Sequence, residues 1–179
     1  MEDTFDKMQS QIDRLTETIS SIMKFSQSST VSRERINLNQ IAQDVLLWMR
    51  PLSKYIPVDL IIDSNEIILS VDRIQISQVL VNLLKNAIEA TELLPSDQQK
   101  NVELKIFING NEAVCEVTNY HSYISPNDIS ELFHPFVSSK KGNTGIGLSI
   151  VKQIVEMHQG SIDVKSDQEK TVFTVKLPL

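Results

Sequence analysis

Hydrophobic residues near the start of the chain recur at alternating intervals of three and four. The remaining positions over residues 3–27 are mostly polar. So narrow an apolar seam predicts a long helix that packs against a second helix, because a helix with one seam and no core of its own is marginal in isolation. We therefore expect a homodimer through residues 3–27, followed by a polar, serine-rich linker over residues 26–35. The seam consists of Phe5, Met8, Ile12, Leu15, Ile19 and Ile22.

After the linker, the pattern changes between helical and strand periods. A helix is expected first, capped by Asn37 or Asn39. A longer helix is expected to begin at Asp72 and to end near residue 94, and Gln75 stands where a reciprocal capping box requires it. Two short apolar runs between these helices suit strands, residues 58–62 and 67–71.

The second half of the chain contains two predicted hairpins and two predicted helices. Asn109-Gly110 between alternating apolar runs is a strong hairpin signal. Ser125 before Pro126 predicts the start of a short helix, and Gly160 predicts the end of a longer one. Segregated helices and strands favour an α+β fold, a two-layer sandwich of one mixed β-sheet with helices on one face. The expected strands are 102–108, 113–118, 161–165 and 171–177, and the longer helix is 146–158.

Composition and charge narrow the class of protein. The 179 residues suffice for one domain and an appendage, and 17 scattered Lys and Arg residues in a chain of net charge −6 argue against nucleic-acid binding. No apolar run reaches the roughly 18 residues of a membrane span, and Met1 is followed by two acidic residues. We therefore expect a cytoplasmic chain without membrane contact of its own, whether or not its parent is membrane-tethered. Cys115 lies in an apolar run and is expected to be a buried thiol.

The long predicted helix carries Asn82 and Asn86 one turn apart within an otherwise apolar stripe. Buried amides cost free energy unless they find partners, and this spacing directs both side chains toward one region. An asparagine oxygen is a neutral ligand suited to Mg²⁺, which also takes phosphate and water oxygens. The spacing leaves two interpretations open, a cation site or amides that bond to neighbouring backbone.

Gly142, Gly145 and Gly147 run directly into the predicted helix at 146–158. Backbone N–H groups exposed by glycine, together with the positive end of a helix dipole, form a cradle for phosphate. The segment is not a Walker loop, since no lysine follows its last glycine. It is not a dinucleotide fingerprint either, since it does not follow the first strand of a βαβ unit. A plain turn is the alternative.

In this order the two features resemble the N box and the G2 box of sensor histidine kinases, and Leu132-Phe133-His134-Pro135-Phe136 resembles their F box. The resemblance covers residues 36–179 and extends to the wider GHKL ATPase group, with the Bergerat fold, that includes gyrase and the heat-shock-90 chaperones. Residues 12–28 also resemble the second helix of the kinase dimerisation domain. The domains implied are a partial dimerisation helix (1–28), a linker (29–36) and an ATP-binding catalytic domain (37–179).

The resemblance implies ATP and Mg²⁺ as cofactors, transfer of the γ-phosphoryl group to a histidine, and a response-regulator receiver domain as partner. Asn86 would bind magnesium, Asn82 would lie near the phosphates, and residues 134–143 would form a lid. The wider group places a glutamate base on this helix, and Asn82 in its place favours phosphoryl transfer over hydrolysis. The residues expected to line the site are Asn82, Lys85, Asn86, Asn119, Lys140, Lys141, Gly142, Thr144, Gly145, Ile146, Gly147 and Leu148.

The chain departs from the family in the G1 box, which reads Asp-Asn-Gly-x-Gly and contacts adenine through its aspartate. Here the aligned residues, the G1 segment, are Asn119-Tyr120-His121-Ser122-Tyr123. The Asn119 oxygen can still accept a hydrogen bond from adenine, while Tyr120 and Tyr123 could fill the adenine site or stack on the base. The alternative function is a non-catalytic scaffold with the kinase fold that dimerises and binds a response regulator. A tyrosine inside the adenine pocket would favour it.

A second departure is the missing phosphoacceptor, because no histidine precedes His121. His121, His134 and His158 stand where surface or packing roles are usual. We therefore expect no catalytic residue within this chain and no autophosphorylation of it; the target histidine belongs to a first helix that is lacking here, or to another protein. An anti-sigma-factor kinase shares the fold, but the dimerisation-type helix argues against it.

Overall fold

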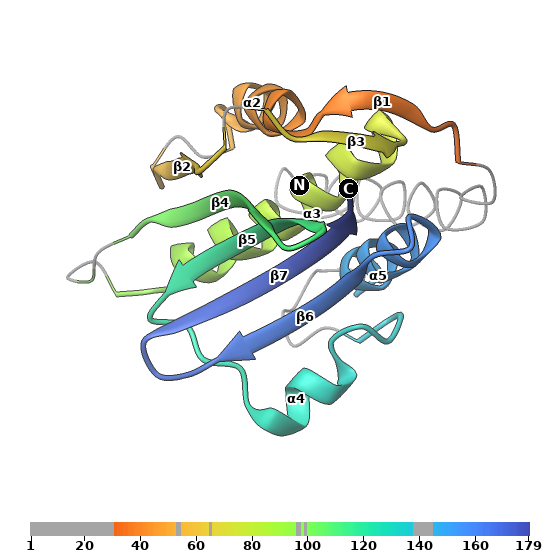
Figure 1. The fold of residues 1–179 in the computed structure, drawn as a ribbon. Helices are drawn as coiled ribbons and strands as arrows, with labels where there is room; N and C mark the ends of the chain where they lie inside the picture. Colours follow the sequence, from red (N-terminus) through yellow and green to blue (C-terminus); the bar gives the residue numbers. More distant parts are fainter. Residues whose placement is uncertain (1–30, 53–54, 65, 96–97, 99, 138–144) are drawn as a thin grey trace, which may run out of the picture.

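The computed structural model describes residues 31–52, 55–64, 66–95, 98, 100–137 and 145–179 (Figure 1). The predicted helix and dimer seam at 3–27 lie outside these residues, so both stay predictions. Among the helices of the described part, none has the length and hydrophobicity that a membrane span requires.

A five-stranded mixed sheet forms one layer of the molecule. Its strand order is β2-β4-β5-β7-β6; β2 runs parallel to β4, and the other neighbours are antiparallel. The predicted strands and hairpins of this sheet are confirmed, with Gly110 at φ 61° in the turn between β4 and β5. The bounds are β2 (Val58–Ile62), β4 (Val102–Asn109), β5 (Glu112–Tyr120), β6 (Ser161–Ser166) and β7 (Lys170–Pro178).

A second, two-stranded sheet pairs β1 (Glu34–Asn37) antiparallel with β3 (Ile68–Val71). The prediction of a linker as far as residue 35 was therefore wrong at its end. β1 has one buried residue, Ile36, and is otherwise exposed or half-buried. The segment has no alternating pattern that would predict a strand. It forms one because β3, more than 30 residues away, supplies its backbone hydrogen bonds.

Helices form the other layer, on one face of the five-stranded sheet (Figure 1). Helix α3 (Arg73–Glu92) packs on β4 and β5, α5 (Gly147–Met157) packs on β6 and β7, and α2 (Leu38–Met49) packs against α3. The predicted α+β sandwich is thus confirmed. The short helix α4 (Pro126–Glu131) begins at Ser125, as predicted, with the serine side chain accepting from Asp128 N.

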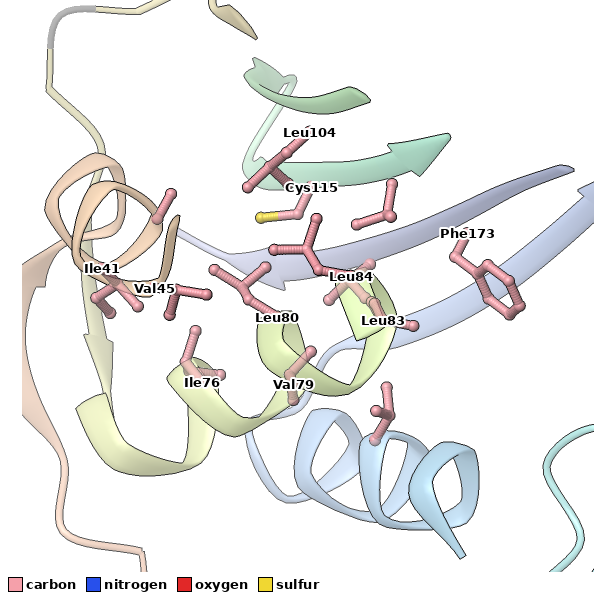
Figure 2. Packing of buried hydrophobic residues seen from close by; sticks show 14 of the residues in the cluster. Ile41, Val45, Ile76, Val79, Leu80, Leu83, Leu84, Leu104, Cys115 and Phe173 are labelled. Atoms are coloured by element: carbon pink, nitrogen blue, oxygen red, sulfur yellow. The ribbon is translucent and has the colours of Figure 1, made fainter. Parts of the chain in front are cut away.

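The core lies between α3 and the sheet (Figure 2). Leu80, Leu83 and Leu84 of α3 are buried against the five-stranded sheet, each 1% exposed or less. Cys115 of β5 lies in the same cluster, and burial raises the pKa of its thiol to about 12. The prediction of a buried thiol is confirmed, and the group stays protonated and unreactive near neutral pH.

Asp72 begins α3, and its side chain accepts hydrogen bonds from Ile74 N at 3.0 Å and Gln75 N at 3.1 Å. The predicted capping box is nevertheless only half formed. The Asp72 N–H, which Gln75 was expected to bind, donates instead to His158 Nε2 at 3.0 Å. His158 is 3% exposed; because its Nε2 accepts from Asp72 N, the ring donates through Nδ1, which lies 2.8 Å from Ile154 O.

The chain entering the domain is attached at the same place. Ser32 N donates to Asp72 Oδ2 at 3.0 Å, and Arg33 Nη2 donates to Met157 O at 3.0 Å. Residues 32 and 33 therefore hold the start of α3 and the last turn of α5 together.

Helix α5 ends in a Schellman motif, with Gly160 N donating to Val155 O and Gln159 N donating to Glu156 O, both at 2.9 Å. The left-handed residue is Gln159, at φ 61°, and not Gly160. Gly160 is required for space instead, because a Cβ there would lie 2.3 Å from the carbonyl oxygen of Lys176.

Candidate functional site

The two sequence motifs meet where the middle of α3 faces the first turn of α5. Asn82 Nδ2 donates to Gly147 O at 3.5 Å, across 65 positions of sequence. A Cβ at Gly147 would lie 3.8 Å from Asn82 Oδ1. A hydrogen bond of this length is weak, so an incoming ligand could replace it at low cost. The structure thus brings Asn82 into contact with the glycine segment.

Asn86 and Lys85 occupy the following turn of α3. Asn86 is half-buried, and Lys85 is exposed with its ammonium 3.9 Å from Glu89 Oε1. Among the described residues, no group of three or more His, Cys, Asp or Glu side chains could hold a metal ion. Mg²⁺ at nucleotide sites usually takes most of its ligands from phosphate and water.

Gly145 adopts the left-handed conformation, at φ 68°. A Cβ on it would lie 2.7 Å from both Phe136 C and Val137 O, and its own oxygen accepts from Phe136 N at 3.1 Å. The end of the F box therefore packs directly on the glycine segment, and only glycine fits there.

Helix α5 begins without a side-chain cap, because Ile146 stands at the N-cap position. Ile146 itself is buried, and Leu148 is half-buried against the core. The side chain of Ile146 has no oxygen with which to cap the first N–H groups of α5. Four further residues predicted to line the site, Lys140, Lys141, Gly142 and Thr144, lie outside the described residues.

The G1 segment continues from the end of β5. Asn119 is 2% exposed and shares its sheet face with Val117 and Cys115, so it points toward the helix layer. Its Nδ2 donates to Ser122 Oγ. The positive φ of the segment, 58°, falls on His121, at the position where the family has glycine, and not on a tyrosine. Histidine tolerates this conformation better than a β-branched residue does.

The two tyrosines lie differently from Asn119. Tyr120 follows it on β5 and therefore points to the opposite face of the sheet. Burial, the nearby charge of Glu103 and a hydrogen bond to Glu103 raise the pKa of the Tyr120 phenol. Tyr123 is 51% exposed. Tyr120 thus does not lie on the helix-facing side of the sheet with Asn119. A tyrosine inside the adenine pocket, which would have favoured the scaffold, is therefore not seen for Tyr120.

A set of hydroxyl groups behind the G1 segment was missed by sequence reasoning. Ile124 N donates to Ser166 Oγ at 2.9 Å, Ser166 Oγ lies 2.7 Å from Thr171 Oγ1, and Thr171 Oγ1 donates to Ser122 O at 2.8 Å. Ser166 and Thr171 are opposite each other in the closing hairpin. Small polar residues at a hairpin end look like ordinary turn residues, so the sequence carried no signal for this set.

The chain is similar to known proteins over most of its length. Residues 71–179 match the family described as histidine kinase-, DNA gyrase B-, and HSP90-like ATPase. The chain is 30% identical over 176 residues to the sensor histidine kinase ZraS of Salmonella typhimurium, covering 96% of this chain and 37% of ZraS. It is 32% identical over 178 residues to the C4-dicarboxylate transport sensor protein DctS of Rhodobacter capsulatus, covering 98% and 27%. The chain spans about a third of the length of these relatives.

Solved structures share the fold. The nucleotide-free catalytic domain of histidine kinase ThkA superposes with a TM-score of 0.73 at 27% identity, covering 82% of this chain and 95% of that one. ThkA in complex with response regulator protein TrrA gives 0.80 at 24% identity, covering 97% and 49%. Full-length ShkA in complex with AMPPNP gives 0.78 at 20% identity, covering 93% and 36%. The last two show likeness of fold alone.

Proposed function

The chain belongs to the histidine kinase-, DNA gyrase B- and HSP90-like ATPase family, and from that membership we propose that it binds ATP as the catalytic domain of a sensor histidine kinase. The observation that carries the proposal is the contact of Asn82 with Gly147 beside the uncapped first turn of α5. An amide, a glycine and the N–H groups of a helix start without a side-chain cap, all at one point, suit the phosphates of a nucleotide.

The phosphates would lie between α3 and the start of α5. Gly145 and Gly147 let the nucleotide approach the backbone closely, and the α5 N–H groups would donate to phosphate oxygens. Asn82 would exchange its weak bond to Gly147 O for a bond to the ligand. The further groups proposed here are Lys85, Lys140, Lys141, Gly142 and Thr144, of which the lysines offset phosphate charge.

Asn86 is the proposed magnesium ligand. It projects one turn beyond Asn82 on the same face of α3, so its oxygen would face the outer phosphates. A neutral amide ligand suits an ion that shares several phosphate and water oxygens. When bound, Mg²⁺ would neutralise charge on the phosphates. Asn119 would accept a hydrogen bond from adenine at the other end of the nucleotide.

The proposed reaction moves the γ-phosphoryl group from ATP to an imidazole nitrogen of a histidine outside this chain. The bond from the β,γ-bridging oxygen to Pγ breaks, a P–N bond forms, and ADP leaves. Asn82 holds the phosphates but has no carboxylate with which to activate water, so transfer is favoured over hydrolysis. A response-regulator receiver domain would then take the phosphoryl group from that histidine.

Calorimetric titration of the chain with ATP and Mg²⁺ tests the proposal. We expect saturable binding that Asn86→Ala weakens about tenfold in the presence of Mg²⁺, the cost of losing one ligand to a charged ion. Asn111→Ala, in the exposed β4–β5 turn, is the matched control and should bind as the parent does. Absence of heat at millimolar nucleotide, with the circular dichroism of a folded chain, would refute the proposed function.

A further inference from the structure

We propose that Ser122 is a positioning residue that fixes the direction of the Asn119 amide and thereby makes the site select a base with an exocyclic amine over one with a carbonyl in its place. The inference rests on the proposed function, in which Asn119 contacts the base. It deepens that function, because it assigns specificity to a residue that is itself outside the base contact.

An asparagine has two unlike ends, an oxygen that accepts and an NH₂ group that donates. The two look alike in shape, so a neighbour has to decide which one faces the ligand. In Asn119 the NH₂ group is committed, because Nδ2 donates to Ser122 Oγ. Among the described residues no hydrogen bond to Asn119 Oδ1 is seen, which leaves the oxygen as the end that can accept from a ligand.

Ser122 can serve as the reference because its backbone is anchored. Its carbonyl accepts from Thr171 Oγ1 at 2.8 Å. Thr171 is directed there by Ser166, whose oxygen already accepts from Ile124 N at 2.9 Å and whose hydrogen is therefore left for Thr171 Oγ1. Ser166 and Thr171 each accept from one neighbour and donate to the next, and the series ends on the backbone carbonyl of Ser122, which it holds in place.

A second anchor lies on the other side of Ser122. His121 N donates to Glu169 O at 2.6 Å, in the turn between β6 and β7. The serine therefore sits between two backbone attachments to the closing hairpin. Such a residue can orient a neighbouring side chain without large movement of its own.

The chemical consequence follows from the base. Adenine carries an amine at C6, which would donate to Asn119 Oδ1. Hypoxanthine carries a carbonyl there, and acceptor would face acceptor. Without the Ser122 hydroxyl the amide can turn over and present Nδ2 to the carbonyl, so both bases would be accommodated. An aspartate at position 119 would need no such control, because its two oxygens are equivalent.

The experiment is calorimetry of the full chain with Mg²⁺ and either ATP or inosine triphosphate, which differ at this position of the base. We expect the parent chain to bind ATP about tenfold more tightly, the value of one hydrogen bond exchanged for a repulsive contact. Ser122→Ala should bring the ratio of the two dissociation constants to within about twofold of one, mainly by tightening inosine triphosphate. Ser161→Ala, an exposed serine on the edge strand β6, is the matched control and should keep the parent ratio.

An Asn119→Asp background separates positioning from a structural effect. There Ser122→Ala should leave the ratio unchanged, and a drop in the ratio as large as that in the parent background would overturn the proposal. An unchanged ratio in Ser122→Ala itself, with ATP still bound, would also overturn it. Ser122→Cys, which keeps the size but is a weaker hydrogen-bond partner, should give an intermediate ratio and serves if the alanine variant fails to fold. If the parent chain binds neither nucleotide, the proposed function fails first and this inference falls with it.

Discussion

Two glycines of this chain are required for different physical reasons. Gly110 has φ 61° and nothing within 4 Å of a Cβ added to it, so its requirement is conformational. Gly160 lies in contact with the backbone of β7, so its requirement is space. The distinction cannot be made from the sequence, since both glycines follow a predicted element.

The two requirements predict different costs. Gly160→Ala should lower the free energy of unfolding by about 3 kcal/mol or more, because the added carbon meets a backbone oxygen that cannot turn away. Gly110→Ala should cost only about 1 kcal/mol, the price of a left-handed alanine. Urea unfolding of both variants checks this, and a Gly160→Ala cost no larger than that of Gly110→Ala would contradict the packing argument.

Cys115 predicts an alkaline loss of stability. Its pKa is about 12 in the folded chain, above the ordinary value of 9.0 that the unfolded chain regains. The folded state therefore keeps its proton where the unfolded state releases it, and stability falls as the pH rises above 9. Between pH 8 and pH 10 the parent chain should lose about 1 kcal/mol more than Cys115→Ala, measured by urea unfolding. Equal losses in the two proteins would show that the thiol is not protected by burial.

At the scale of elements, the sequence predicted what is repeated along a segment and missed what depends on a distant partner. The long helix was visible because its apolar face recurs through Leu80, Leu83 and Leu84. β1 was missed because its pairing partner is far away in the chain. The half-formed capping box has the same cause, since His158 lies 86 residues from Asp72. In the proposed site, Asn82 and Gly147 were predicted from their motifs, whereas the role proposed for Ser122 rests on its neighbours in the fold.

The end of α5 offers a test at this scale. Gln159 occupies the left-handed position of the Schellman motif, where glycine is the usual residue. Gln159→Gly should therefore raise the free energy of unfolding by about 0.5–1 kcal/mol. Gln168→Gly, at an exposed turn residue without positive φ, should be neutral or destabilising. Thermal unfolding of both distinguishes them, and a destabilised Gln159→Gly would speak against the motif.

At the scale of the molecule, the proposed site draws on three elements that are far apart in sequence. α3 supplies Asn82, α5 supplies Gly147, and β5 supplies Asn119 on the face that α3 covers. The proposed site therefore depends on the whole sandwich and not on any one segment. Self-association is a separate prediction, since the apolar seam at 3–27 lies outside the described residues.

Sedimentation tests that prediction. The full chain should sediment as a dimer, and a chain lacking residues 1–28 should sediment as a monomer with the same nucleotide affinity, because the apolar seam at 3–27 would bury its surface only against a second copy. A monomer in both cases would remove the predicted dimer.

The left-handed backbone at His121 bears on how such sites are found. The G1 box is written in amino-acid letters as a glycine box, and a search for those letters would pass over residues 119–123. The chain nevertheless takes a left-handed turn at this point, with histidine at φ 58°. A search written in backbone angles, for a strand that ends in a buried amide or carboxylate and then a left-handed residue two positions later, would find it. Such a search would find relatives whose G1 glycines have been replaced and which a search by sequence motif would miss.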